Sequence, residues 1–142
     1  MQRCLIIDGS AIIRKVTRII LADFGYETIE ARTGKEGLAD FHKQTPHLVM
    51  VDSHLTDMAA LDVLRQIKTA SAGSVYVLYC TTEYDILDLQ RAHAAGASDV
   101  LIKPFDRPSL AAKLDARAVE VATAGRPNFY TRLSQSDLKR IA

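Results

Sequence analysis

Short apolar runs alternate along this chain with longer segments in which apolar residues recur at helical spacing. The apolar runs fall at residues 3–7, 28–31, 48–51, 75–80 and 99–102, a length typical of buried strands. Helical spacing is found at 10–23, 34–42, 59–68 and 86–95, and a last helix is expected to begin near Pro108. This alternation predicts an α/β fold with one doubly wound parallel sheet.

Local signals fix several ends of these elements. Ser10 is a candidate N-cap for the first helix, and Gly25 and Gly96 stand where the first and fourth helices should stop. Right-handed crossovers leave few topologies, of which we expect strand order 2-1-3-4-5. The pattern ends near residue 123, which predicts a domain over 1–122 and an extension over 123–142, a linker followed by a short helix.

Composition narrows the class of protein. The chain has 142 residues, 48% of them hydrophobic, and a formal net charge of +1, which is typical of one soluble globular domain. Its apolar runs are far shorter than a membrane span, so we expect a cytoplasmic protein. Cys4 and Cys80 fall on strands that are not neighbours in this order, which predicts two buried thiols. The histidines show no zinc-ligand spacing.

Candidate chemistry gathers at the carboxyl ends of the strands, where open α/β sheets bind ligands. Asp8, Asp52, Thr81 and Lys103 each follow or end a predicted strand. Two carboxylates could hold Mg²⁺, and an ammonium group and a hydroxyl could bind a phosphoryl group. The same charges could instead form a buried structural ion-pair network. With Gly9 as the single glycine of the first strand–helix turn, neither a dinucleotide fingerprint nor a Walker loop is present.

Five blocks in order make the sequence similar to a known family over residues 3–120: LIID (5–8), LVMVD (48–52), TTE (81–83), AGAS (95–98) and KPF (103–105). They resemble the receiver domain of bacterial two-component response regulators, of the CheY-like type. The resemblance implies a flavodoxin-like signalling domain, not an enzyme. It also implies that Asp52 accepts a phosphoryl group from a histidine kinase or phosphotransfer protein.

The same resemblance assigns roles to the other site residues. Asp8, Asp52 and the backbone carbonyl of His54 would surround Mg²⁺, Thr81 would be the switch hydroxyl, and Lys103 would contact the phosphate. The Lys103–Pro104 peptide would be cis.

Departures from the family pattern weaken these expectations. Gly9 stands where receivers carry a second acid, which predicts weak or lost Mg²⁺ binding. Val100 replaces the switch aromatic residue on the last strand. Two interpretations stay open, a weak phosphoacceptor and a receiver that does not depend on phosphate.

The extension over residues 123–142 suggests an input signal other than phosphorylation. Residues 123–142 hold four basic residues and one acidic residue, a net charge of +3, which leaves −2 for residues 1–122. A subclass of CheY-like proteins binds cyclic di-GMP through an arginine-rich stretch after the last helix, and this extension resembles it. The candidate ligand residues are Arg126, Phe129, Tyr130, Arg132 and Arg140. The alternatives are a helix packed on the domain through Leu133, Leu138 and Ile141, disorder, or nonspecific contact with RNA or membrane.

Two functions therefore compete. In the first, a CheY-like regulator binds a partner such as a flagellar motor switch component through the helix at 86–95, the strand at 99–102 and the last helix. Its candidate contact residues are Tyr84, Leu87, Gln90, Val100, Lys113 and Arg117. In the second, the extension folds over a cyclic dinucleotide. Binding to DNA is not expected, because residues 1–142 offer no second folded domain with a recognition helix. A dehalogenase-type hydrolase would need an acidic residue at position 10, where this chain has Ser10.

Overall fold

The structure is a computed structural model that describes residues 1–82 and 85–122, and of residues 120–122 the backbone alone. Its five parallel strands form one sheet in the order β2-β1-β3-β4-β5, as predicted. The strands are β1 (Gln2–Ile7), β2 (Tyr26–Ala31), β3 (Leu48–Asp52), β4 (Tyr76–Thr81) and β5 (Asp99–Ile102).

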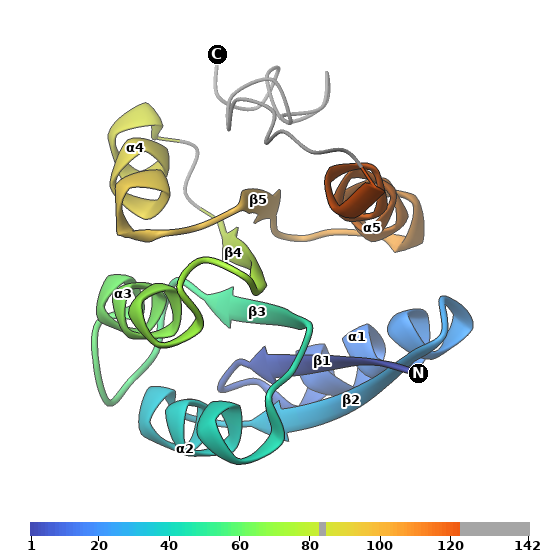
Figure 1. Cartoon of the computed structure of the whole chain (residues 1–142), viewed down its shortest axis with the longest axis horizontal. Helices are drawn as coiled ribbons and strands as arrows, with labels where there is room; N and C mark the ends of the chain where they lie inside the picture. Colours follow the sequence, from blue (N-terminus) through green and yellow to red (C-terminus); the bar gives the residue numbers. More distant parts are fainter. Residues whose placement is uncertain (83–84, 123–142) are drawn as a thin grey trace.

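Helices cover both faces of the sheet (Figure 1). On one side lie α1 (Ala11–Asp23) and α5 (Arg107–Ala122), and on the other α2 (Gly34–Gln44), α3 (Ala60–Ser71) and α4 (Ile86–Ala95). The predicted fold class, a doubly wound flavodoxin-like sheet, is confirmed.

Alternation along the strands divides the core into two layers. Leu5, Ile7 and Val49 belong to the cluster under α2, α3 and α4, whereas Cys4 and Ile6 belong to the cluster under α1 and α5. Because successive strand residues point to opposite faces, an almost unbroken apolar run such as LVMV in β3 feeds both layers. This accounts for the short, wholly apolar strands seen in the sequence.

Helix ends with a chemical signal were predicted correctly. The Ser10 hydroxyl accepts the backbone N–H of Ile13, and Gly25 and Gly96 adopt φ of 83° and 118° after α1 and at the end of α4. Two other helices end beyond their predicted limits. The helices α2 and α3 continue to Gln44 and Ser71, and each is followed by a residue other than glycine in the left-handed region, Thr45 and Ala72.

Two further predictions concern the cysteines and the extension. Both thiols are buried and free, as expected, and burial raises the pKa of Cys80 to about 12. The candidate nucleotide-binding residues of the extension, all between 126 and 140, lie outside the described residues. Among the helices that the structure describes, none is long and apolar enough to span a membrane.

Candidate functional site

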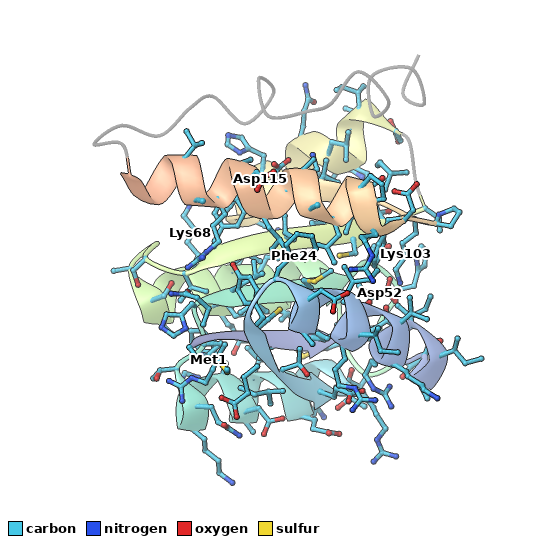
Figure 2. The ribbon with its side chains drawn as sticks, turned by 90° about the vertical axis from the view of Figure 1, so that its right-hand side faces the viewer. Met1, Phe24, Asp52, Lys68, Lys103 and Asp115 are labelled. Atoms are coloured by element: carbon cyan, nitrogen blue, oxygen red, sulfur yellow. The ribbon has the colours of Figure 1, made fainter. Side chains whose placement is uncertain are left out.

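The sheet topology brings the predicted site residues to one edge. Asp8 follows β1, Asp52 ends β3, Thr81 ends β4 and Lys103 follows β5. The register pairs Ile7 with Val51 and residue 81 with Ile102, so the carboxyl ends of these strands lie level. Figure 2 shows Asp52 and Lys103 beside each other at this edge of the sheet.

The ammonium group of Lys103 lies between the two carboxylates. Its Nζ atom is 2.6 Å from Oδ2 of Asp8 and 3.0 Å from Oδ1 of Asp52. The side chains of Asp8, Asp52 and Lys103 are 7%, 13% and 13% exposed, so water screens these contacts little. Three side chains that are 95 and 51 residues apart thus form one charged cluster with a net charge of −1.

The cluster shifts the titration of its lysine. Burial alone would lower the pKa of Lys103, because the charged form loses water. The hydrogen bonds and charges of Asp8 and Asp52 outweigh this effect and raise the pKa of Lys103 above its ordinary value. The lysine is therefore a fixed cation at neutral pH.

Asp8 is held from two further directions. Its Oδ1 atom accepts the backbone N–H of Ser10 at 2.9 Å, and its backbone carbonyl accepts Nη1 of Arg14 at 2.8 Å. Arg14 also donates from Nε to Glu30 at 3.2 Å, with only 11% of its side chain exposed. Sequence reasoning missed Arg14, because nothing in the spacing shows that an arginine of α1 turns back to the strand end.

Asp57 is a second residue that sequence reasoning missed. Its two carboxylate oxygens accept the backbone N–H groups of Gly34 and Lys35 at 2.8 and 2.9 Å. These hydrogen bonds lower the pKa of Asp57. The loop that follows Asp52 is thereby attached to the first turn of α2, whose free N–H groups favour an anion.

The remaining site residues are placed as follows. Thr81 is fully buried beside the cluster, and the Lys103–Pro104 peptide is cis, as the resemblance implied. His54 is exposed and its Nδ1 atom lies 2.9 Å from the Ser53 hydroxyl. A hollow of about 10 Å³ lies beside Asp52 and Lys103, room for about one water molecule.

The residues present are a poor fit for Mg²⁺. Receiver domains normally bind Mg²⁺ at this acidic pocket, and Mg²⁺ prefers several oxygen ligands. Here Gly9 brings no oxygen, and Asp8 and Asp52 are both paired with Lys103. No group of three His, Cys, Asp or Glu side chains suited to a metal occurs within 1–82 and 85–122.

The surface predicted to bind a partner is only partly exposed. Leu87 and Gln90 are exposed on α4, but Val100 is fully buried and Lys113 is 4% exposed. Lys113 is turned inward because its Nζ atom pairs with Oδ1 of the buried Asp99 at 3.3 Å.

Arg117 is also bound within the protein. It donates to the Tyr26 hydroxyl and to Gln2, both at 2.9 Å. Tyr84 lies outside the described residues. The predicted interface is therefore reduced to α4.

Comparison with known proteins identifies the family. Residues 4–115 match the response regulator receiver domain. The chain is 30% identical over 131 residues to the probable transcriptional regulator ycf27 of Pyropia yezoensis, covering 89% of this chain and 53% of that protein. It is also 30% identical over 116 residues to the DNA-binding response regulator MtrA of Mycobacterium leprae, covering 82% and 51%. The chain thus spans about half the length of these curated relatives.

Solved structures of receiver proteins are similar to this chain in fold. The chemotaxis protein CheY4 of Vibrio cholerae has a TM-score of 0.77 at 29% identity, covering 81% of this chain and 97% of that one. A CheY-like receiver domain protein of Methanospirillum hungatei has a TM-score of 0.81 at 27% identity, covering 88% and 99%. With the acidic cluster, the cis peptide and the strand order in agreement, the chain belongs to the response regulator receiver domain family of two-component signalling.

Proposed function

We propose that this receiver signals through Asp52 as a phosphoacceptor in which Lys103 carries most of the charge compensation and Mg²⁺ contributes little. The supporting observation is the position of the Lys103 ammonium group, 2.6 Å from Asp8 and 3.0 Å from Asp52. In most receivers a second acidic residue helps to hold the Mg²⁺ ion. Here Gly9 cannot bind a metal ion through its side chain, so Lys103 is the cation next to both carboxylates.

In this proposal, phosphoryl transfer to Asp52 uses only this cluster and the donor. An oxygen of Asp52 attacks phosphorus, the phosphorus–nitrogen bond of a phosphohistidine breaks, and the electron pair leaves with the imidazole nitrogen. Lys103 can follow the new negative charge, because its ammonium group already contacts the attacking carboxylate. Asp8 opposes the reaction, since a phosphoryl group and a carboxylate repel each other when no metal ion lies between them.

A phosphate analogue tests the metal dependence. Beryllofluoride with Mg²⁺ is titrated into the protein while amide resonances near Asp52 are followed by NMR. We expect small shifts in the natural sequence and a saturating response in Gly9→Asp. A β-carbon at Gly9 would meet only the Arg32 carbonyl oxygen, at 3.8 Å, so the added carboxylate fits.

Ala94→Asp is the matched control, since it adds the same charge on the exposed surface of α4. Saturation of the natural sequence at ordinary Mg²⁺ concentrations would contradict weak metal dependence. Failure of acetyl phosphate to label Asp52 at any Mg²⁺ concentration would contradict the phosphoacceptor itself, and Asp52→Asn gives the background for that measurement.

An apolar stripe beside the cluster supports a protein as the phosphoryl donor. Ile12, Val16 and Ile19 lie on α1 at i, i+4 and i+7 and are 75%, 46% and 50% exposed. The stripe begins within the first turn after the Ser10 cap, at the edge where Asp52 lies. A histidine kinase or phosphotransfer protein that packs on this stripe would bring its phosphohistidine to that edge.

Two phosphoryl donors, a histidine kinase and acetyl phosphate, separate the effect of docking from that of the chemical step. We expect Val16→Asp to slow phosphorylation by a purified phosphorylated histidine kinase at least tenfold and to leave phosphorylation by acetyl phosphate unchanged. Lys15→Asp is the matched control on the same helix, outside the apolar stripe. Equal loss with both donors, or no loss with the kinase, would count against docking on α1.

For the output, we propose the exposed surface of α4, and a flagellar motor switch component is the partner that the likeness to a chemotaxis protein supports. Ile86 and Leu87 are 44% and 53% exposed there. Leu87→Asp should abolish binding to a purified switch component, and Asp115→Asn on α5 should not affect it. Binding that survives Leu87→Asp would exclude this surface.

The basic extension supports a second candidate function, a cyclic di-GMP effector that does not need phosphate. The support is its charge of +3 with Phe129 and Tyr130 between Arg126 and Arg132. Calorimetry with cyclic di-GMP should show binding that Arg126→Ala or Arg132→Ala removes and that Asp52→Ala leaves intact. Unchanged affinity in both arginine variants would discard this function.

A further inference from the structure

A second cavity lies at the edge of the sheet opposite to Asp52. It has a volume of about 380 Å³ and is formed by the ends of α2 and α3, the loops after them and Arg117 of α5. In Figure 2 this edge is the one near Met1 and Lys68, far from Asp52 and Lys103. The volume is within the range of small-molecule sites, and the acidic cluster takes no part in it.

The ionisable side chains that line the cavity are all basic. The described lining residues include a guanidinium group, Arg117, and two imidazoles, His42 and His47, but no carboxylate. The opposite edge, in contrast, holds a cluster with a net charge of −1. The two edges would therefore select ligands of different charge.

Arg117 has a donor left over. Its Nη1 and Nη2 atoms bond to Tyr26 and Gln2, which fixes the guanidinium plane, while the buried Nε atom finds no hydrogen-bond partner within the described part of the chain. Nη1 and Nη2 carry two hydrogens each and donate one of them to Tyr26 and Gln2, so Arg117 keeps one hydrogen on each of these nitrogens for an acceptor that enters the cavity.

His47 offers a second donor. Its Nδ1 atom accepts the backbone N–H of Arg3 at 3.0 Å, so the proton of the neutral ring is on Nε2. Ser71 and Ser74 donate their hydroxyl protons to backbone carbonyls, so the donors for a ligand's oxygens are Arg117 and His47. The apolar side chains of Phe41, Pro46 and Val75 complete the lining.

We propose that this cavity binds a small organic oxyanion, a carboxylate or a phosphate monoester, with its oxygens against Arg117 and His47 and its carbon skeleton on the apolar residues. The proposal does not depend on phosphorylation of Asp52 or on the extension. It gives the receiver a ligand site that joins α2, α3 and α5 at the edge away from the phosphoacceptor.

The test uses two aromatic anions and a neutral analogue of the same shape. Benzoate and phenyl phosphate are titrated separately into the full chain, and the backbone amides of Thr45, His47, Ser71 and Ser74 are followed by NMR. We expect at least one anion to give saturating shifts at these amides and benzyl alcohol to give none. The anion that binds more tightly identifies the oxyanion class.

Variants locate the site. Arg117→Gln should weaken binding of that anion at least tenfold, and Arg91→Gln, which removes the same charge from the exposed surface of α4, should leave it unchanged. Ala70→Leu fills the cavity while keeping every donor, so it tests the site even if Arg117→Gln perturbs the fold. No saturation with either anion, equal shifts with benzyl alcohol, or undiminished binding in Ala70→Leu would overturn the proposal.

Discussion

At the scale of single residues, the charge on Lys103 sets the stability of the cluster. Two carboxylates as poorly hydrated as Asp8 and Asp52 would repel each other without the ammonium group between them. Removing one partner of a buried ion pair is much more costly than the pair is worth, because a charge is left without compensation.

Lys103→Met should therefore lower the free energy of unfolding by about 3 kcal/mol at pH 7. Adding Asp8→Asn should restore part of that loss, since one of the two repelling charges is removed. Urea unfolding of both variants measures the effect, with the exposed Lys15→Met as control. If the double variant loses as much stability as Lys103→Met and Asp8→Asn lose together, the electrostatic explanation is contradicted.

The same lysine predicts a pH dependence. Because the pKa of Lys103 is raised in the folded protein above its ordinary 10.5, its stabilisation is complete below about pH 10. It is lost as the pH rises through the folded-state pKa. The difference in unfolding free energy between the natural protein and Lys103→Met should thus narrow above about pH 10.5. A difference that stays constant up to pH 12 would exclude this linkage.

The three residues of the cluster could be predicted from the sequence, but neighbouring residues that fix the loops of the site, such as Asp57, could not. Asp8, Asp52 and Lys103 follow strands, and parallel strands present their carboxyl ends at one edge. Asp57 meets residues 23 positions earlier, at the start of α2, through the path of a loop that hydrophobic periodicity does not describe. Val100 and Lys113 were placed at the surface by analogy, but both are buried, Lys113 because its ammonium group pairs with the buried Asp99.

At the scale of elements, strands and helices with periodic sequences were predictable, whereas their ends required a local signal. Gly25 and Gly96 mark helix ends because glycine adopts positive φ without strain. Thr45 and Ala72 adopt positive φ after α2 and α3, and the nearest end signals, Pro46 and Gly73, come directly after them, beyond the predicted ends of these helices.

The attachment of Asp57 to α2 is expected to depend on acid. Its hydrogen bonds to Gly34 and Lys35 lower the pKa of Asp57 below the ordinary 3.8, so their stabilisation is present above about pH 4 and lost as the pH falls through the folded-state pKa. The amide resonances of Gly34 and Lys35 should shift with that protonation in an NMR titration. Asp57→Asn should abolish the shift and the exposed Asp115→Asn should preserve it. Identical curves in all three proteins would contradict this assignment.

Close packing of α2 on β1 leaves no room for a β-carbon at Gly37 unless Ile7 moves. A β-carbon there would lie 2.4 Å from Cδ1 and 2.6 Å from Cγ1 of the buried Ile7. Alanine normally stabilises a helix by about 1 kcal/mol relative to glycine. We expect Gly37→Ala instead to destabilise the protein by about 1–3 kcal/mol, as overpacking does.

Ile7→Val tests that contact, because it removes Cδ1. The double variant should lose less stability than the two single losses combined, measured by urea unfolding. A Gly37→Ala protein more stable than the natural one would show that Ile7 moves aside without cost.

At the scale of the whole molecule, the two described core layers draw on every strand and helix of the receiver domain. The described buried clusters run from Cys4 to Leu114 and include side chains from all five strands and all five helices. Residues 123–142, outside the described part of the chain, have a net charge of +3. Because the elements of the receiver domain supply both described layers, we expect the extension to serve binding more than folding.

A chain shortened to residues 1–122 should therefore unfold in a single transition, with a free energy of unfolding within about 1 kcal/mol of the full chain. Its net charge changes from +1 to −2, so its affinity for polyanions should fall while the beryllofluoride response of Gly9→Asp is retained. Chemical unfolding and heparin affinity measure the two quantities, and the full chain with Arg126, Arg132 and Arg140 changed to glutamine separates charge from length. A loss of several kcal/mol on shortening, without a matching loss in the glutamine variant, would instead mean that the extension packs on the domain through Leu133, Leu138 and Ile141.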